Sequence, residues 1–194
     1  MTSLLKQRLS TVLKGWNEML MPDVVLDTNV LADFLAQFFG AAQRGRTSFV
    51  EQDTISRELA RKINQIVRWY GWNSNVVDDD EEQYPGKVVA SAFAFVEIAR
   101  KWADIVRDRF TVEQMASFVE QPPEWFVIEP VDENLVLAFC DIPTDVLTTH
   151  GQIRSLEWPD AVHIATAFGR GDDSLLAVTD VQIRRVAILQ GRLV

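Results

Sequence analysis

The sequence contains almost no cysteine and no long apolar run. Its single cysteine, Cys140, cannot close an internal disulfide, so nothing favours an oxidising compartment, and we expect this side chain in the core. No apolar stretch approaches the roughly 20 residues that a helix needs to cross a membrane. These absences favour a cytoplasmic protein with no membrane partner.

Basic residues are also scarce relative to acidic ones. Lysine and arginine together number 19 and aspartate and glutamate 28, giving a formal net charge of −9. Because phosphate binding normally uses a basic surface, this balance argues against a nucleic-acid enzyme. Part of the excess lies in the run Asp78–Glu82, and a catalytic carboxylate cluster would add negative charge that a bound metal neutralises. Net charge therefore weakens a nucleic-acid function without excluding it.

The length and composition are those of one globular domain with an elaboration. The chain has 194 residues, of which 47% are hydrophobic and 24% charged, whereas single domains most often contain about 100–150 residues. Helical spacing of leucine and valine predicts an amphipathic helix over residues 1–21. We expect the main domain over residues 22–194, with a helical and acidic elaboration at residues 41–86.

Short apolar runs alternate with segments of helical periodicity along the main domain. Strands are predicted at 23–26, 87–91, 125–128 and 175–179, and helices at 30–40, 54–70, 92–109, from 111 to before 122, 132–139 and 158–169. A short helix and a last strand are expected over 181–189. This alternation predicts an α/β fold, a three-layer α/β/α sandwich around a central, mainly parallel sheet.

Four carboxylates occupy positions that suggest a shared site. Asp27 and Asp180 each follow an apolar strand, Asp160 lies in the first turn of a helix behind Pro159, and Glu97 interrupts an apolar helix. The carboxyl ends of parallel strands form a ligand-binding crevice, and clustered carboxylates repel one another unless a cation joins them. Oxygen ligands suit Mg²⁺ or Mn²⁺, which can activate water and polarise a phosphodiester.

Three of the four acids also have an ordinary structural explanation, whereas Glu97 lies within an apolar stretch where a surface salt bridge is less natural. Asp27 is placed to cap a helix, Asp160 is favoured by the helix dipole, and Asp180 can simply end a strand. His163 is best explained as a partly buried histidine of an apolar helix rather than a ligand. The joint occurrence of all four acids favours a metal site over four unrelated structural roles.

Four motifs then resemble the PIN-domain family of nucleases, and they occur in that family's order. They are Val24–Leu31 (VVLDTNVL), Ser91–Glu97 (SAFAFVE), Trp158–Ala167 (WPDAVHIATA) and Leu176–Asp180 (LAVTD). The resemblance implies a PIN-like fold in which Asp27, Glu97, Asp160 and Asp180 bind metal and act in catalysis, with Asn29 and Thr179 as supporting polar groups. It also implies cleavage of single-stranded RNA, as in VapC-like toxins of toxin–antitoxin pairs.

The leading hypothesis is therefore a Mg²⁺- or Mn²⁺-dependent endoribonuclease, a phosphodiester hydrolase. The partners expected are RNA, a small antitoxin protein and a second copy of the chain, and an antitoxin helix would fit an apolar groove made by Val30–Phe39 and Thr54–Tyr70. The alternative is a PIN-like RNA-binding or scaffold protein with weak or no catalysis. A phosphatase of the haloacid dehalogenase type is disfavoured, because Asn29 stands where that chemistry needs a second acid.

Overall fold

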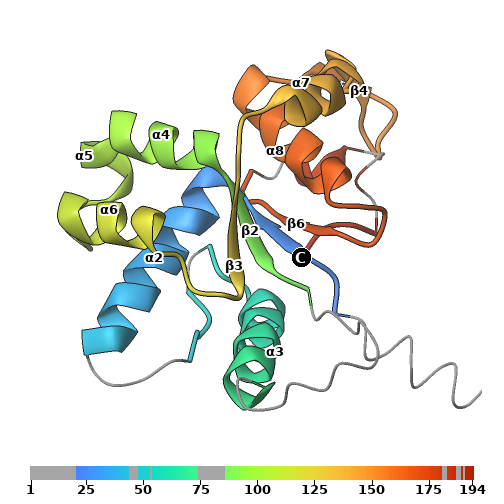
Figure 1. The fold of residues 1–194 in the computed structure, drawn as a ribbon. Coiled ribbons are helices and arrows are strands. Elements are labelled where there is room, and N and C mark those ends of the chain that lie inside the picture. The colour runs from blue at the N-terminus through green and yellow to red at the C-terminus, as the bar shows by residue number, and fades with distance from the viewer. Residues whose placement is uncertain are drawn as a thin grey trace, which may run out of the picture.

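A parallel sheet forms the centre of the protein in the computed structural model (Figure 1). The structure describes residues 21–43, 48–52, 54–73, 86–180, 183–186, 189 and 191–194. Within these residues the main sheet has the strand order β3-β2-β1-β6, and all its pairings are parallel. The strands are β1 (Val24–Leu26), β2 (Val88–Ser91), β3 (Phe126–Glu129) and β6 (Leu175–Ala177).

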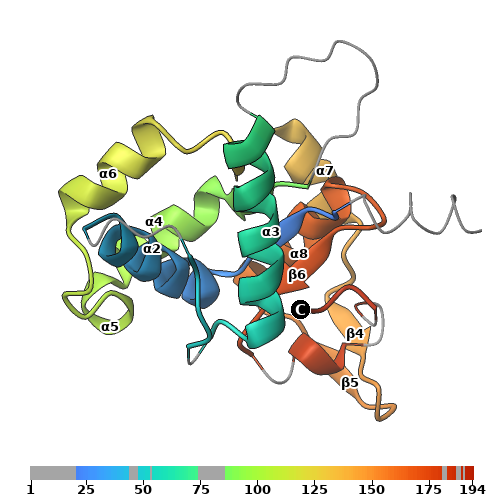
Figure 2. The same ribbon diagram turned by 90° about the horizontal axis from the view of Figure 1, so that it is seen from below.

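Both faces of the sheet are covered, because successive residues of a strand point to opposite sides. On β1, Val24 and Leu26 belong to one core cluster and Val25 to the other. The helices on the first side are α2 (Thr28–Gln43), α3 (Arg57–Asn73), α4 (Ala92–Arg100), α5 (Trp102–Ile105) and α6 (Val112–Glu120), and those on the second are α7 (Glu133–Cys140) and α8 (Trp158–Gly169). Figure 1 shows α2, α4, α5 and α6 on one side of the strands and α7 and α8 on the other, with α3 below them, and Figure 2, seen from below, shows α3 in front. The predicted α/β class with a central parallel sheet is confirmed, in an arrangement compatible with a three-layer sandwich.

Local sequence signals set several helix boundaries as predicted. Thr111 and Gln114 form a reciprocal capping box that opens α6. Asp132 accepts a hydrogen bond from a backbone N–H of α7, and Pro159 lies in the first turn of α8, where its missing N–H costs nothing.

Other boundaries differ from the prediction. Helix α2 continues past Gly40, since one glycine costs a helix only about 1 kcal/mol, which a packed helix can absorb. The helix expected over 92–109 is broken at Lys101 into α4 and α5. A hairpin of β4 (Asp145–Leu147) and β5 (Ile153–Ser155) was not predicted, because both strands contain polar or charged residues and neither is a continuous apolar run. Cys140 is exposed rather than in the core, because it ends α7 on the side away from the sheet-facing Leu135.

The apolar groove expected between the early helices is not formed by the residues named for it. Phe34, Leu35, Leu59, Ile63 and Ile66 are almost completely buried in the core of this chain. Their apolar area is already used to pack α2 and α3, so it does not remain open to a partner helix.

Two expectations lie outside the described residues. These are the helix at 1–21, except for its last residue, and the acidic part of the 41–86 elaboration, residues 74–85. The helix expected over 54–70 is present as α3. Among the described residues, no helix combines the length and the hydropathy that a membrane span requires.

Candidate functional site

A cleft of about 300 Å³ lies at the carboxyl end of the parallel sheet and brings the four predicted acids together. Asp27, Glu97, Asp160 and Asp180 all line it, and so do both residues predicted to support them, Asn29 and Thr179. The acids come from the end of β1, the middle of α4, the first turn of α8 and the segment after β6. The crevice expected from the strand-end rule is thus present and acidic.

Asp27 is the deepest of these acids, with only 7% of its surface exposed. Its Oδ1 accepts a hydrogen bond from the backbone N–H of Val30 at 2.7 Å, and its Oδ2 accepts one from the backbone N–H of Thr179 at 2.9 Å. Burial raises the pKa of Asp27 from 3.8 to about 6, although these backbone N–H groups oppose the rise. The carboxylate therefore ties β1 to the segment after β6 and retains a proton more readily than an exposed aspartate.

Asp27 also performs the structural role that the sequence allowed for it. Its hydrogen bond to Val30 caps the start of α2, and Asp180 likewise accepts a hydrogen bond from the backbone N–H of Ile183 at 3.2 Å. An asparagine or serine could cap α2 without placing a charge in a buried site. Capping explains the position of each side chain, but it does not explain why ionisable groups gather around one cleft.

The neighbouring acids and burial affect the ionisation of Asp160. Its pKa is raised from 3.8 to about 6, first by burial and then by the negative charge of Asp180, with a smaller contribution from Asp27. Arg154 on β5 opposes this rise, and its Nη1 lies 3.8 Å from Oδ1 of Asp180. The hairpin that the sequence did not predict thus supplies a cation to the edge of the cleft.

Glu97 is held in a different environment. Burial alone would raise its pKa, but hydrogen bonds from Lys101 and Thr28 outweigh burial and lower the pKa below its usual value. Lys101 Nζ lies 2.6 Å from Oε1, and Thr28 Oγ1 donates to Oε2 at 2.5 Å. The surroundings of Glu97 therefore stabilise its ionised form, whereas those of Asp27 and Asp160 oppose ionisation.

His163 is buried, as the sequence indicated, yet it also lines the cleft. Its Nε2 lies 3.1 Å from Thr28 Oγ1 and 3.9 Å from Glu97 Oε2, while Nδ1 is buried without a hydrogen-bond partner. Burial lowers the pKa of His163 to about 4, so the ring is neutral at physiological pH. Since Thr28 gives its only hydroxyl proton to Glu97, a hydrogen bond from Nε2–H to Thr28 completes the chain of contacts.

Four residues around the cleft were not predicted to belong to the acidic site. Thr28 stood inside a recognised motif without a role, Lys101 lay within a predicted continuous helix, and Glu157 and Arg154 carried no pattern. The spacing of Glu97 and Lys101, four residues apart on a helix, was the one available signal of an ion pair. The contacts of the other three depend on tertiary structure.

The donor chemistry of the cleft suits a hard divalent cation, although the side chains do not form a closed metal cage. In the described part of the chain, no three His, Cys, Asp or Glu side chains are grouped closely enough to hold a metal ion. Glu97 is turned toward Lys101 and Thr28 instead. Mg²⁺ commonly binds through only one or two carboxylates and keeps several waters. Asp27, whose negative charge is opposed by burial, and Asp160, whose charge is opposed by burial and by Asp180, fit that kind of binding.

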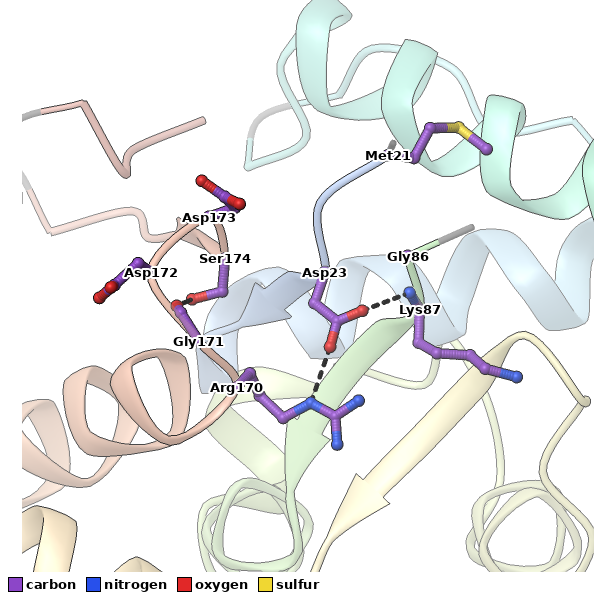
Figure 3. Close-up of a pocket in the computed structure, with 9 residues that line it drawn as sticks. All are labelled: Met21, Asp23, Gly86, Lys87, Arg170, Gly171, Asp172, Asp173 and Ser174. Atoms are coloured by element: carbon purple, nitrogen blue, oxygen red, sulfur yellow. Dashed lines mark hydrogen bonds and ion pairs between the residues drawn. The ribbon is translucent and has the colours of Figure 1, made fainter. Parts of the chain in front are cut away.

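Two other hollows of the described surface have a different character. One lies at the opposite end of the sheet, where Asp23 accepts hydrogen bonds from Arg170 Nε and from the backbone N–H of Lys87, both at 2.7 Å (Figure 3). Its central carboxylate joins the start of β1 to the start of β2 and to the end of α8. The other hollow is lined by Arg57, Arg61 and Arg68 of α3 and shares no residue with the acidic cleft.

Comparison with known proteins does not place the chain in a family: no family model, curated protein or solved structure matches it. The PIN-domain resemblance of its four motifs therefore remains a prediction, and the function has to be inferred from the cleft itself.

Proposed function

We propose that the chain is a Mg²⁺- or Mn²⁺-dependent endoribonuclease with a PIN-like fold, which hydrolyses phosphodiester bonds of single-stranded RNA in the acidic cleft. One observation carries the proposal. Four acids that are far apart in the sequence line the same cleft at the carboxyl end of a parallel sheet, and two of them have pKa values raised to about 6. A divalent cation is the simplest group that would relieve this accumulation of negative charge.

The residues of the cleft would have distinct roles. Asp27 and Asp160 would hold the cation, with Glu97 and Asp180 as further oxygen donors. When bound, such a cation supplies an activated water and polarises the phosphodiester. Asn29 Nδ2 donates to Thr179 Oγ1 at 3.3 Å, and the Thr179 backbone N–H fixes Oδ2 of Asp27. These two residues thus act by holding the deepest carboxylate in place.

The assignment as a VapC-like toxin rests on motif resemblance alone, and an antitoxin is accordingly part of the proposal. An RNA-binding or scaffold protein with weak or no catalysis is the second candidate. It is favoured by the absence of a closed metal-binding group in the described residues. Catalysis and metal binding separate the two candidates.

The test compares cleavage of a mixed single-stranded RNA pool by the wild type, Asp27→Asn and Asp160→Asn in Mg²⁺, Mn²⁺ or EDTA. Asp173→Asn is the matched control, since Asp173 is an exposed aspartate outside the cleft. We expect metal-dependent cutting that either cleft variant lowers by about 100-fold or more, because metal assistance contributes several kcal/mol to such reactions. Binding of Mn²⁺, followed by calorimetry without RNA, should weaken in the same two variants only.

Two results would overturn the proposal. Equal cleavage by the wild type and both cleft variants would identify a contaminating nuclease. Binding of RNA without cleavage in either metal, together with unchanged calorimetry in Asp27→Asn, would favour the scaffold alternative.

A further inference from the structure

An exposed tryptophan stands beside the acidic cleft. Trp158 is the first residue of α8 and is 57% exposed, although exposing an indole to water is unfavourable. Its two sequence neighbours, Glu157 and Pro159, both line the cleft, and Asp160 follows two positions later. A large apolar ring is therefore presented to solvent at the edge of the candidate active site.

The ring is supported on one side. The ring of Phe93, in the first turn of α4, has its centroid 4.6 Å from that of Trp158, with an interplanar angle of 56°. Phe93 is itself partly buried, and its centroid lies 6.3 Å from that of His163, which lines the cleft. Pro159 restricts the backbone next to Trp158. Support from Phe93 and a restricted backbone make Trp158 a pre-organised flat surface.

The next turns of α4 continue this surface with an apolar residue and two cations. Val96 is 61% exposed, and Arg100 and Lys101 are exposed at the end of the helix. A flat aromatic ring followed by positive charges matches a nucleotide, which offers a base to stack on and a phosphate to attract.

We propose that Trp158, backed by Phe93, is a stacking site for one nucleobase of single-stranded RNA, adjacent to the acidic cleft. The inference rests on the proposed function, since it assigns part of the substrate site of that nuclease. Stacking holds the strand by a base and leaves the neighbouring phosphodiester directed toward the carboxylates. Because every base has an aromatic face, this contact contributes affinity with little sequence preference.

The size of the patch favours a base over a protein partner. A stable protein interface buries about 800 Å² and involves about 20–30 residues on each side. The patch, defined here as the Phe93–Trp158 ring pair together with Val96 three positions after Phe93 on α4, borders an acidic cleft. One nucleobase would cover such a patch, whereas a second folded chain would need a much larger surface.

The test measures binding of a short single-stranded oligoribonucleotide by fluorescence anisotropy, in the Asp27→Asn background so that no cleavage interferes. Trp158→Ala should weaken binding by about 5- to 100-fold, the range expected for one base–aromatic stack. Trp158→Phe should recover part of the loss. Trp69→Ala is the matched control, since Trp69 is a partly exposed tryptophan on α3 that does not line the cleft.

A second arm replaces single nucleotides of the oligonucleotide with abasic ones. At one position the abasic change should weaken binding to the parent protein as much as Trp158→Ala does, and it should have no further effect on that variant. Additive losses at every position, or equal affinities of Trp158→Ala and the parent, would overturn the stacking site. A fall in molecular mass of Trp158→Ala in sedimentation, with unchanged RNA affinity, would also overturn it and assign the patch to self-association.

The results of this experiment can support or overturn the stacking site independently of the nuclease proposal. Base-dependent binding without metal-dependent cleavage would support Trp158 as an RNA contact while removing the catalytic function. Cleavage that is insensitive to Trp158→Ala and to abasic substitution would keep the nuclease and remove the stacking site.

Discussion

Replacing Asp27 by asparagine should stabilise the metal-free protein, and by more as the pH rises. The pKa of Asp27 is raised from 3.8 to about 6, which corresponds to about 3 kcal/mol at roughly 1.4 kcal/mol per pKa unit. Because the folded pKa lies above the unfolded one, ionisation of Asp27 destabilises the fold. The penalty is absent below about pH 4, grows as the pH rises from there to about 6, and is complete above that value.

The difference in free energy of unfolding between Asp27→Asn and wild type isolates the effect of ionising Asp27. Asparagine lacks the second acceptor oxygen that now binds a backbone N–H, which subtracts about 1 kcal/mol at every pH. His163, with its pKa lowered to about 4, contributes stability above pH 6.5 that is lost as the pH falls, but it does so in both proteins. The pH-dependent part of the difference therefore belongs to Asp27 and to Asp160, whose raised pKa Asp27 helps to maintain.

Urea unfolding in EDTA between pH 4.5 and 7.5 measures this difference directly. We expect the advantage of Asp27→Asn over wild type in unfolding free energy to grow from near zero at pH 4.5 to about 2 kcal/mol at pH 7.5. Addition of Mn²⁺ at about 100 times its Kd should then stabilise wild type by about 2.7 kcal/mol and the variant by much less. A difference that stays constant with pH would refute the argument that burial of this carboxylate opposes its charge.

Three further predictions concern other parts of the molecule. Lys101→Gln should raise Mn²⁺ affinity up to about fivefold in calorimetry by removing a competing cation, whereas Lys101→Arg should not; a weaker affinity in Lys101→Gln would contradict this. Arg109→Ala should lower the free energy of unfolding by about 3 kcal/mol, because it leaves the buried Asp33 unpaired, and adding Asp33→Asn should restore part of the loss. Gly86→Ala should cost about 2 kcal/mol or more, since an added Cβ would lie 2.2 Å from the carbonyl oxygen of Pro22; an unchanged urea midpoint would show that the backbone moves apart easily.

The parts of the fold that were predictable are those set by local pattern. The apolar runs at Val24–Leu26 and Leu175–Ala177 are long enough to mark strands, and Thr111 and Asp132 mark helix starts through their own hydrogen bonds. Because parallel strands end at one edge, two strand ends were sufficient to predict that Asp27 and Asp180 lie near each other. The cleft that both of them line agrees with that prediction.

The parts that were missed depend on partners from distant segments. Thr28 and Glu97 are 69 positions apart, and Thr28 and His163 are 135 apart, so no periodicity could pair them. The break at Lys101 has no proline or glycine to announce it. Similarly, Val30 and Phe34 have the spacing of an amphipathic helix face, and this spacing is the same whether the face packs on the chain's own sheet or on a partner. In this structure the face packs on the sheet.

The net charge of −9 argued against a nucleic-acid enzyme. The electrostatic potential at the cleft, however, depends less on this net charge than on the charges nearest to the cleft. Screening at physiological ionic strength limits exposed charges to a range of about 8 Å. Lys101 lies in the cleft, Arg154 lies within 3.8 Å of Asp180, and Arg100 is exposed at the end of α4. A strand that stacks on Trp158 would lie close to these cations as well as to the carboxylates, and a bound divalent ion would change the sign of the local field. RNA affinity should therefore depend on metal and on this local rim of cations more than on the charge of the whole chain.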